Sequence, residues 1–227
     1  MIHKKEIKFF DDNGYLFIDK FIKKNIITGI KSEISKTLKK IGKDSKNFEV
    51  LYEDDGSIRL VRNIHDNIEF FKNLVVSSSL IEIAKSLLKS DVYVLNSKLN
   101  IKSAFTGGHF DWHQDYGYWY NNGCLFPHLA SCMIAVDQAT VANGCLQVLK
   151  GSHLMGRIEH ERVGDQTGAS LERVEVARQR LELVHCELEA GSAVFFHCNL
   201  LHRSDQNKSE KPRWAFICCC NYFCLLF

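Results

Sequence analysis

The chain is poor in the residues that usually separate domains. Its 227 residues include only two prolines, Pro127 and Pro212, and no segment is rich in Pro, Gly or Ser. Domain boundaries normally lie in such segments, and mainly β domains can reach this length as one unit. No internal repeat is visible either. The sequence therefore predicts a single domain over residues 1–227.

Long apolar runs and a dominant charge are also missing. The N-terminal segment lacks the apolar core of a signal peptide, and no run approaches the roughly 20 apolar residues of a membrane helix. With 29 Lys and Arg against 27 Asp and Glu, the formal net charge is +2. No global field attracts nucleic acid or an anionic membrane, so the expected partner is a small molecule. Nothing here predicts the oligomeric state.

The cysteine pattern excludes two common structural uses. All nine cysteines lie in the second half of the chain, their number is odd, and none forms a Cys-x-x-Cys pair. Neither a disulfide framework nor a zinc finger is expected. Several cysteines occupy apolar segments such as "LASCMIAV", where Cys acts as a small hydrophobic residue. We expect a reducing, cytoplasmic compartment.

The pattern of apolar residues changes near residue 90. Upstream, the apolar residues of segment 26–41 follow a period of 3.6, and "SSSLIEIAKSLLKS" adds a serine cap to a similar pattern, which predicts helices. Downstream, short β-rich segments alternate with turns, which indicates a barrel or jelly roll. We expect a mainly β fold with a helix-rich part at 1–90 and a β core at about 91–223. A helical, lid-like insertion is expected at about 154–182.

The stretch "HFDWHQD", residues 109–115, contains two His-x-Asp pairs. In an extended strand, residues i and i+2 share a face, so either pair places an imidazole beside a carboxylate, ready to chelate a metal. A third ligand is available downstream, where "FFHCNLLHRSDQN" offers His197 and His202. Two His and one carboxylate leave three positions open on an octahedral ion, as in non-haem Fe(II) oxygenases. Spacing alone leaves both pairs possible.

An oxygenase that uses 2-oxoglutarate also needs a cation for the far carboxylate of that cosubstrate. Arg213, in "KPRWAF", enters the last predicted strand 11 residues after His202. Its planar guanidinium can hold a carboxylate through two hydrogen bonds. Taken alone, an arginine in this place is better explained as a surface charge at the end of a strand.

Several segments together resemble a known family: "WHQD", "YGYW", "NGCLQVLKGSH", "GSAVFFHCNLLHRSDQN" and "PRW". In this order and spacing they resemble the phytanoyl-CoA dioxygenase family, to which ectoine hydroxylase is related. "FFDDNGYLFIDKFI" is similar to the entry strand of that family, so the resemblance covers nearly the whole chain. It implies a double-stranded β-helix (jelly roll, cupin-like) with helices packed on the outside. It also implies Fe(II), 2-oxoglutarate and O₂, and hydroxylation of an unactivated C–H with release of succinate and CO₂.

The resemblance also implies roles for individual residues. His113, Asp115 and His202 match the iron ligands, and therefore the catalytic centre. Ser204 and Arg213 match the residues that bind the distal carboxylate of 2-oxoglutarate. The presence of Asp115 favours hydroxylation over halogenation, because related halogenases carry a small residue there.

Further roles follow from less specific matches. Lys102 matches a lysine that contacts the cosubstrate, although another alignment favours Lys98. Trp119 matches an aromatic wall beside the cosubstrate. The residues expected to line the substrate cavity are Asn96, Gln114, Tyr116 and Tyr118. Strand alternation, however, would point Gln114 to the opposite face unless the strand ends there.

Four further His and Asp residues have structural explanations, and two other functions fit the same fold. We expect His109 and Asp111 at the pocket mouth or in solvent, His197 in the core, and His153 in support of a loop. One alternative function is a non-catalytic metal- or ligand-binding protein of the same fold. Another is a cupin-like metalloenzyme that does not use 2-oxoglutarate, which would leave the match at Arg213 unexplained.

Overall fold

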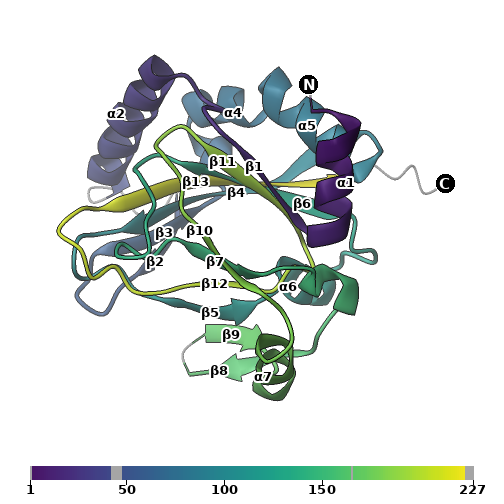
Figure 1. The fold of residues 1–227 in the computed structure, drawn as a ribbon. Coiled ribbons are helices and arrows are strands. Elements are labelled where there is room, and N and C mark those ends of the chain that lie inside the picture. Colours follow the sequence, from purple (N-terminus) through teal and green to yellow (C-terminus); the bar gives the residue numbers. More distant parts are fainter. Residues whose placement is uncertain (1, 42–47, 165, 223–227) are drawn as a thin grey trace.

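Two antiparallel sheets face each other in the computed structural model, which describes residues 2–41, 48–164 and 166–222 (Figure 1). The large sheet has seven strands, in the order β1 (Tyr15–Ile18), β11 (Ala193–His197), β6 (Leu129–Ala135), β13 (Arg213–Tyr222), β4 (Val92–Lys102), β3 (Ile58–Arg62) and β2 (Glu49–Tyr52). The small sheet has four, in the order β10 (Leu183–Cys186), β7 (Leu146–Leu149), β12 (His202–Ser204) and β5 (Phe110–His113). The predicted jelly-roll arrangement is present.

Helices from the first third of the chain cover the outer face of the large sheet (Figure 1). They are α1 (Lys4–Asn13), α2 (Lys24–Ile41), α3 (Ile64–Asn67), α4 (Glu69–Val75) and α5 (Ser78–Leu88). The apolar stripe of α2, including Ile30 and Ile34, packs in one core with Leu99, Phe195 and Phe216 of the sheet. A second core lies between the two sheets and includes residues of β6, β7 and β11. The helices therefore lie outside the β core, as predicted.

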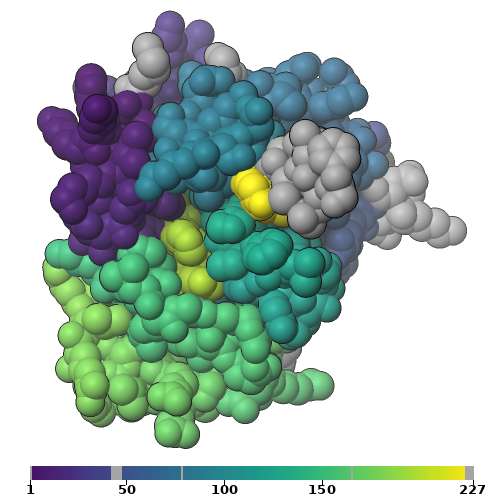
Figure 2. All heavy atoms as spheres, turned by 90° about the vertical axis from the view of Figure 1, so that its right-hand side faces the viewer, coloured from purple at the N-terminus to yellow at the C-terminus, as the bar shows by residue number. Residues whose placement is uncertain are grey.

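The N-terminal helix α1 also contacts the segment that follows β7, around Gly151 and His153. The Gly151 amide donates to the Asn13 carbonyl at 2.9 Å, and a ring nitrogen of His153 lies 3.0 Å from the Asp11 carbonyl. Figure 2 shows α1, in purple, directly beside green residues of this part of the chain. His153 thus ties the short helix η2 (Ser152–Met155) to α1. This agrees with its expected structural role.

Three details differ from the sequence-based predictions. The helix-rich N-terminal part also contributes β2 and β3 to the large sheet. The insertion holds the predicted helix, α7 (Leu171–Arg178), and also a hairpin of β8 (His160–Val163) and β9 (Gln166–Ala169). Its apolar residues form a small core with Trp112. The strand expected over 109–115 ends at His113, and α6 (Asp115–Asn121) begins two residues later. No helix in the described ranges is long and apolar enough to cross a membrane.

Candidate metal centre and cosubstrate pocket

A pocket of about 590 Å³ lies between the two sheets. Strands of both sheets line it, together with α6 and one edge of the β8–β9 hairpin. The sequence predicted site roles for eleven residues, and nine of them line this pocket. Those that line it are Asn96, His113, Gln114, Asp115, Tyr118, Trp119, His202, Ser204 and Arg213. Lys102 and Tyr116 do not line it, and Lys98 lines the pocket in place of Lys102.

Three ligand-type side chains meet at this pocket. Ligand atoms of His113, Asp115 and His202 all lie within 4.8 Å of one another, and no other such group of His, Cys, Asp or Glu occurs among the described residues. His113 and His202 are partners in the antiparallel pairing of β5 with β12, and their ring centroids are 4.0 Å apart. Two strands of the small sheet therefore bring the two imidazoles together.

Asp115 reaches the two histidines by a different route from the one predicted. Strand alternation would place it on the face of His113, but Gln114 is the extended residue that precedes α6, with φ −117° and ψ 135°. Asp115 is the first residue of that helix. The turn from strand to helix, rather than the two-residue period of a strand, brings the carboxylate to the site.

Hydrogen bonds fix which ring nitrogen each histidine offers. Nδ1 of His113 lies 2.7 Å from the Asp111 carbonyl, and Nδ1 of His202 lies 2.9 Å from the Leu200 carbonyl. A carbonyl only accepts, so each Nδ1 carries the proton and each Nε2 keeps a free lone pair. Burial lowers the pKa of both rings. The neutral form that a metal requires is thereby favoured.

The carboxylate of Asp115 is held in its charged form. The Ser131 hydroxyl donates to Asp115 Oδ2 at 2.6 Å. Burial alone would raise the pKa of Asp115, but Lys98, His202 and His113 lower it below the ordinary value. Two imidazole nitrogens and one carboxylate oxygen on one side of a roomy pocket form the donor set of a non-haem Fe(II) centre. The residues present therefore fit this metal.

Arg213 is a buried cation with an unused donor. Its Nη2 donates to the Gly144 carbonyl at 2.9 Å and its Nη1 to Asn100 Oδ1 at 3.4 Å. Its Nε has no partner, and no carboxylate of the described chain pairs with it. Burial lowers the pKa of Arg213 to about 10, so the group stays charged at neutral pH. A buried, unpaired charge is costly unless a ligand of opposite charge joins it, which fits the far carboxylate of 2-oxoglutarate.

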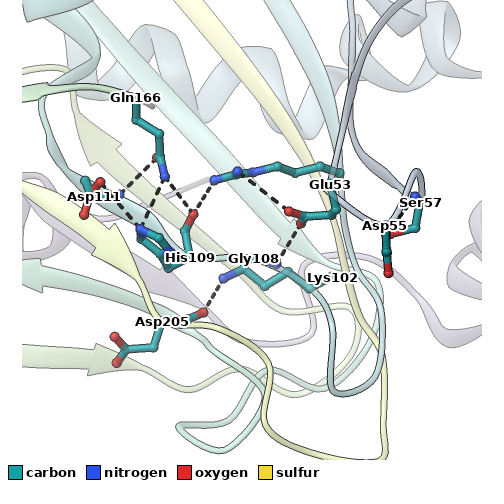
Figure 3. Close-up of polar contacts among 10 residues, drawn as sticks. Glu53, Asp55, Ser57, Lys102, Gly108, His109, Asp111, Gln166 and Asp205 are labelled. Carbon is teal, nitrogen blue, oxygen red and sulfur yellow. Dashed lines mark hydrogen bonds and ion pairs between the residues drawn. The ribbon is translucent and has the colours of Figure 1, made fainter. Parts of the chain in front are cut away.

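The two candidate lysines of β4 lie in different surroundings. Lys102 is buried and donates to the backbone carbonyl of Asp205 (Figure 3). Burial, then the charges of Arg213 and Arg59, lower the pKa of Lys102 to about 6. Lys98 lines the pocket, and its charge lowers the pKa of all three members of the triad. Its ammonium group has no hydrogen bond or ion pair with any described residue. Lys98 is therefore the lysine that is free to meet a bound molecule.

The second His-x-Asp pair lies at the rim. His109 Nε2 is 3.6 Å from Asp111 Oδ2, and the side chains are 57% and 33% exposed. Figure 3 shows this pair beside Gln166, and in the described chain no third His, Cys, Asp or Glu completes a metal-type group with it. His197 is also outside the triad, because its Nδ1 accepts the Asn199 amide at 3.0 Å. The positions of His109 and Asp111 agree with the expectation, whereas His197 is partly rather than fully buried.

A hydrogen-bonded cluster at the rim, which we call the mouth network, surrounds His109. Arg59 of β3 and Gln166 of β9 both donate to the His109 carbonyl. Glu53, in the β2–β3 turn, lies 3.7 Å from Arg59 and accepts the Gly108 amide at 2.7 Å. Figure 3 shows these contacts. Two hairpins that are distant in sequence thus meet at one backbone carbonyl.

Gln114 and Tyr116 have hydrogen bonds that point to structural roles. The Gln114 amide nitrogen donates to the carbonyls of Gly156 and Asn199, at 2.8 and 2.7 Å, and its oxygen accepts the Ile158 amide at 2.7 Å. The Tyr116 hydroxyl donates to the Leu125 carbonyl at 2.6 Å. In the described chain Tyr116 is buried and does not line the pocket, contrary to expectation.

Sequence reasoning missed two residues at the site. His160 Nε2 accepts a hydrogen bond from the backbone amide of Gln114 at 2.9 Å, while His160 Nδ1 lies 2.9 Å from the Ile158 carbonyl. A Cβ on Gly117 would lie 2.0 Å from this ring, so only glycine fits there. Ser131, the partner of Asp115, is the other. Its signal was a lone hydroxyl in the apolar segment "LASCMIAV".

Comparison with known proteins identifies the family. The model of the family described as phytanoyl-CoA dioxygenase matches residues 10–215. The chain belongs to the phytanoyl-CoA dioxygenase family. This member is 31% identical to L-proline trans-4-hydroxylase of Streptomyces griseoviridis over 193 residues, covering 78% of this chain and 72% of that protein. It is 27% identical to ectoine dioxygenase of Stutzerimonas stutzeri over 219 residues, covering 90% and 72%.

Solved structures show the same fold. EctD from S. alaskensis, crystallised with 2-oxoglutarate and 5-hydroxyectoine, superimposes with a TM-score of 0.87 at 24% identity, covering 97% of this chain and 76% of that one. The predicted family and double-stranded β-helix are confirmed. The protein is an Fe(II)- and 2-oxoglutarate-dependent dioxygenase, as the sequence predicted.

Proposed function

We propose that this dioxygenase hydroxylates a C–H bond of a small organic substrate, with iron bound by His113, Asp115 and His202. The observation that carries the proposal is the triad itself, whose ligand atoms lie within 4.8 Å of one another at a pocket of about 590 Å³. Bound Fe(II) would supply the redox chemistry that couples O₂ and the decarboxylation of 2-oxoglutarate to oxidation of the substrate. Relatives named for proline and ectoine support a small substrate.

The residues of the chain orient the reacting molecules. Nε2 of each histidine and one oxygen of Asp115 would hold the metal, which would leave positions for reactants. Arg213 binds the far carboxylate of 2-oxoglutarate through its unused Nε, and Ser204 lies on the strand that carries His202. Lys98 offers its ammonium group to a carboxylate close to the metal.

The substrate end of the pocket lies beyond Lys98 along β4. The Asn96 amide nitrogen donates to Asn63 Oδ1, and Asn96 Oδ1 has no partner among the described groups. Whichever way the two amides are oriented, the pair keeps one donor group and one acceptor unused. Tyr118, with the Arg62 guanidinium 5.9 Å from its ring centroid, and Trp119 form an aromatic wall. We assign Asn96, Tyr118 and Trp119 to contacts with bound organic molecules.

Anaerobic titration tests the proposal. Fe(II) and 2-oxoglutarate are added to metal-free protein, and the visible charge-transfer band of the chelate is followed. Succinate release with O₂ is then compared with and without L-proline, ectoine and related small molecules. A band that needs both additions, and a substrate that raises succinate release, support the proposal. Absence of the band would contradict it.

A further inference from the structure

Strand β6 carries one hydroxyl group in an otherwise apolar sequence. All seven residues of Leu129–Ala135 are buried, and six of them are Leu, Ala, Cys, Met or Ile. A buried hydroxyl is costly unless it is hydrogen-bonded. Ser131 meets this requirement by donating to Asp115 Oδ2 at 2.6 Å. The polar residue in the strand is therefore explained by its contact with the carboxylate.

The contact fixes how Asp115 faces the pocket. In the described chain, Ser131 is the only group that hydrogen-bonds the Asp115 side chain, so it alone distinguishes the two carboxylate oxygens. It donates to Oδ2, and Oδ1 has no hydrogen bond in the described chain. Ser131 itself has little freedom, because its strand is paired on both sides, with Phe196 of β11 and Cys219 of β13. A side chain in the middle of a seven-stranded sheet is a rigid support.

We propose that Ser131 is a positioning residue that holds Asp115 as a ligand through one oxygen. The inference rests on the proposed function, in which Asp115 binds the metal. Two histidines and one carboxylate oxygen leave three positions on an octahedral ion, two for 2-oxoglutarate and one for O₂. A carboxylate free to rotate and bind through both oxygens would occupy one of these positions. Ser131 thus keeps a coordination position open for reactants.

The test uses Co(II) as a spectroscopic probe in metal-free protein. Ser131→Ala removes the hydrogen bond, and Ser131→Thr keeps a hydroxyl at the same Cβ. Ser192→Ala is the matched control, since Ser192 is also buried but its hydroxyl accepts the Lys20 amide at 3.2 Å, outside the pocket. The Co(II) dissociation constant, the d–d absorption and its change on adding 2-oxoglutarate are measured, with thermal unfolding as a check of folding.

We expect Ser131→Ala to weaken Co(II) binding roughly 10–100-fold, the usual effect of losing an outer-shell partner. Its d–d spectrum should change and respond less to 2-oxoglutarate, whereas Ser131→Thr should resemble the wild type. Ser192→Ala should bind Co(II) within about twofold of the wild type. If Ser131→Ala unfolds, Ser131→Cys replaces it, because a thiol is only a weak donor.

Two outcomes separate this inference from the proposed function. If Asp115→Ala loses Co(II) but Ser131→Ala keeps wild-type affinity and spectrum, the positioning role is wrong and the ligand set stands. If Asp115→Ala binds Co(II) as tightly as the wild type, the proposed ligand set itself is wrong. Failure of Ser131→Thr to restore the spectrum in a folded protein would also overturn the positioning role.

Discussion

The two His-x-Asp pairs of residues 109–115 share a spacing but lie in different surroundings. His109 and Asp111 are 57% and 33% exposed, and no third ligand is near them in the described chain. Asp115 is only 7% exposed, and His202 completes its site from another strand. Carbonyls and a serine hydroxyl fix the ligand atoms of the inner group. A metal site therefore needs burial, fixed tautomers and a third ligand in addition to spacing.

The largest effect should come from removing one of the proposed iron ligands, compared with removing a residue of the outer His-x-Asp pair. His113→Ala or His202→Ala should reduce Fe(II) affinity by more than the roughly 10–100-fold typical of outer-shell changes, because a direct ligand is lost. His109→Ala and Asp111→Ala are the matched controls and should retain wild-type affinity. The measurement is anaerobic Fe(II) titration with metal analysis. Loss of iron binding in the His109 variant would show that the outer pair, His109 and Asp111, contributes to the metal site.

Arg213→Ala should have the next largest effect, on the cosubstrate. Truncating one partner of a buried charge pair costs roughly 2–5 kcal/mol, so the dissociation constant of 2-oxoglutarate should rise at least about 30-fold. The charge-transfer band is titrated against 2-oxoglutarate at saturating Fe(II). Arg178→Ala, on α7 and more than half exposed, is the control. Unchanged 2-oxoglutarate affinity in the Arg213 variant would rule out this anchoring role.

The two lysines of β4 offer a finer comparison. Lys98→Met removes an unpaired cation from the pocket, and a hydrogen bond to a charged group contributes roughly 1.5–3 kcal/mol. We therefore expect 2-oxoglutarate to bind about tenfold more weakly or worse. Lys102→Met should change this affinity by no more than about threefold, a value within ordinary indirect effects. Isothermal titration in the presence of Fe(II) measures both, and a larger effect in the Lys102 variant would restore Lys102 as the cosubstrate contact.

The smallest effect concerns stability and pH. The pKa of Lys102 falls from 10.5 to about 6 in the folded protein, so between these values the unfolded chain binds more protons. Its burial therefore destabilises the fold most below pH 6, and this penalty fades as the pH rises toward 10.5. Lys102→Met should raise the urea midpoint more at pH 6.5 than at pH 9. An equal rise at the two pH values would show that Lys102 stays charged in the folded state over this range.

Much of the site follows from the sequence because its residues occur in ordered local patterns. His113, Asp115, His202 and Arg213 lie in short segments whose order resembles the family, and the structure brings all four to one pocket. The short β-rich segments separated by turns likewise predicted the β core. The strand boundary at His113 was harder to predict, because it depends on where α6 begins.

The rest required three-dimensional contacts. Lys98 and Lys102 share one face of β4, so the period of a strand cannot tell which reaches the pocket. His160 and Gln114 are 46 residues apart, and their contact exists only because the insertion folds back on β5. The strands β2 and β3 are short and contain charged residues. Their strand pattern is therefore hard to recognise in a region with a strong helical pattern.

The residues of the mouth network, at the entrance of the pocket, are different from the residues proposed to bind iron inside it. Arg59 belongs to one hairpin and Gln166 to another, and both meet the His109 carbonyl four residues before His113. His113, Asp115 and His202, the proposed iron ligands, take no part in that cluster. Relatives with longer or shorter hairpins would thus admit molecules of other sizes while keeping the same reaction. Within such a family, the range of substrates can diversify by loop variation alone.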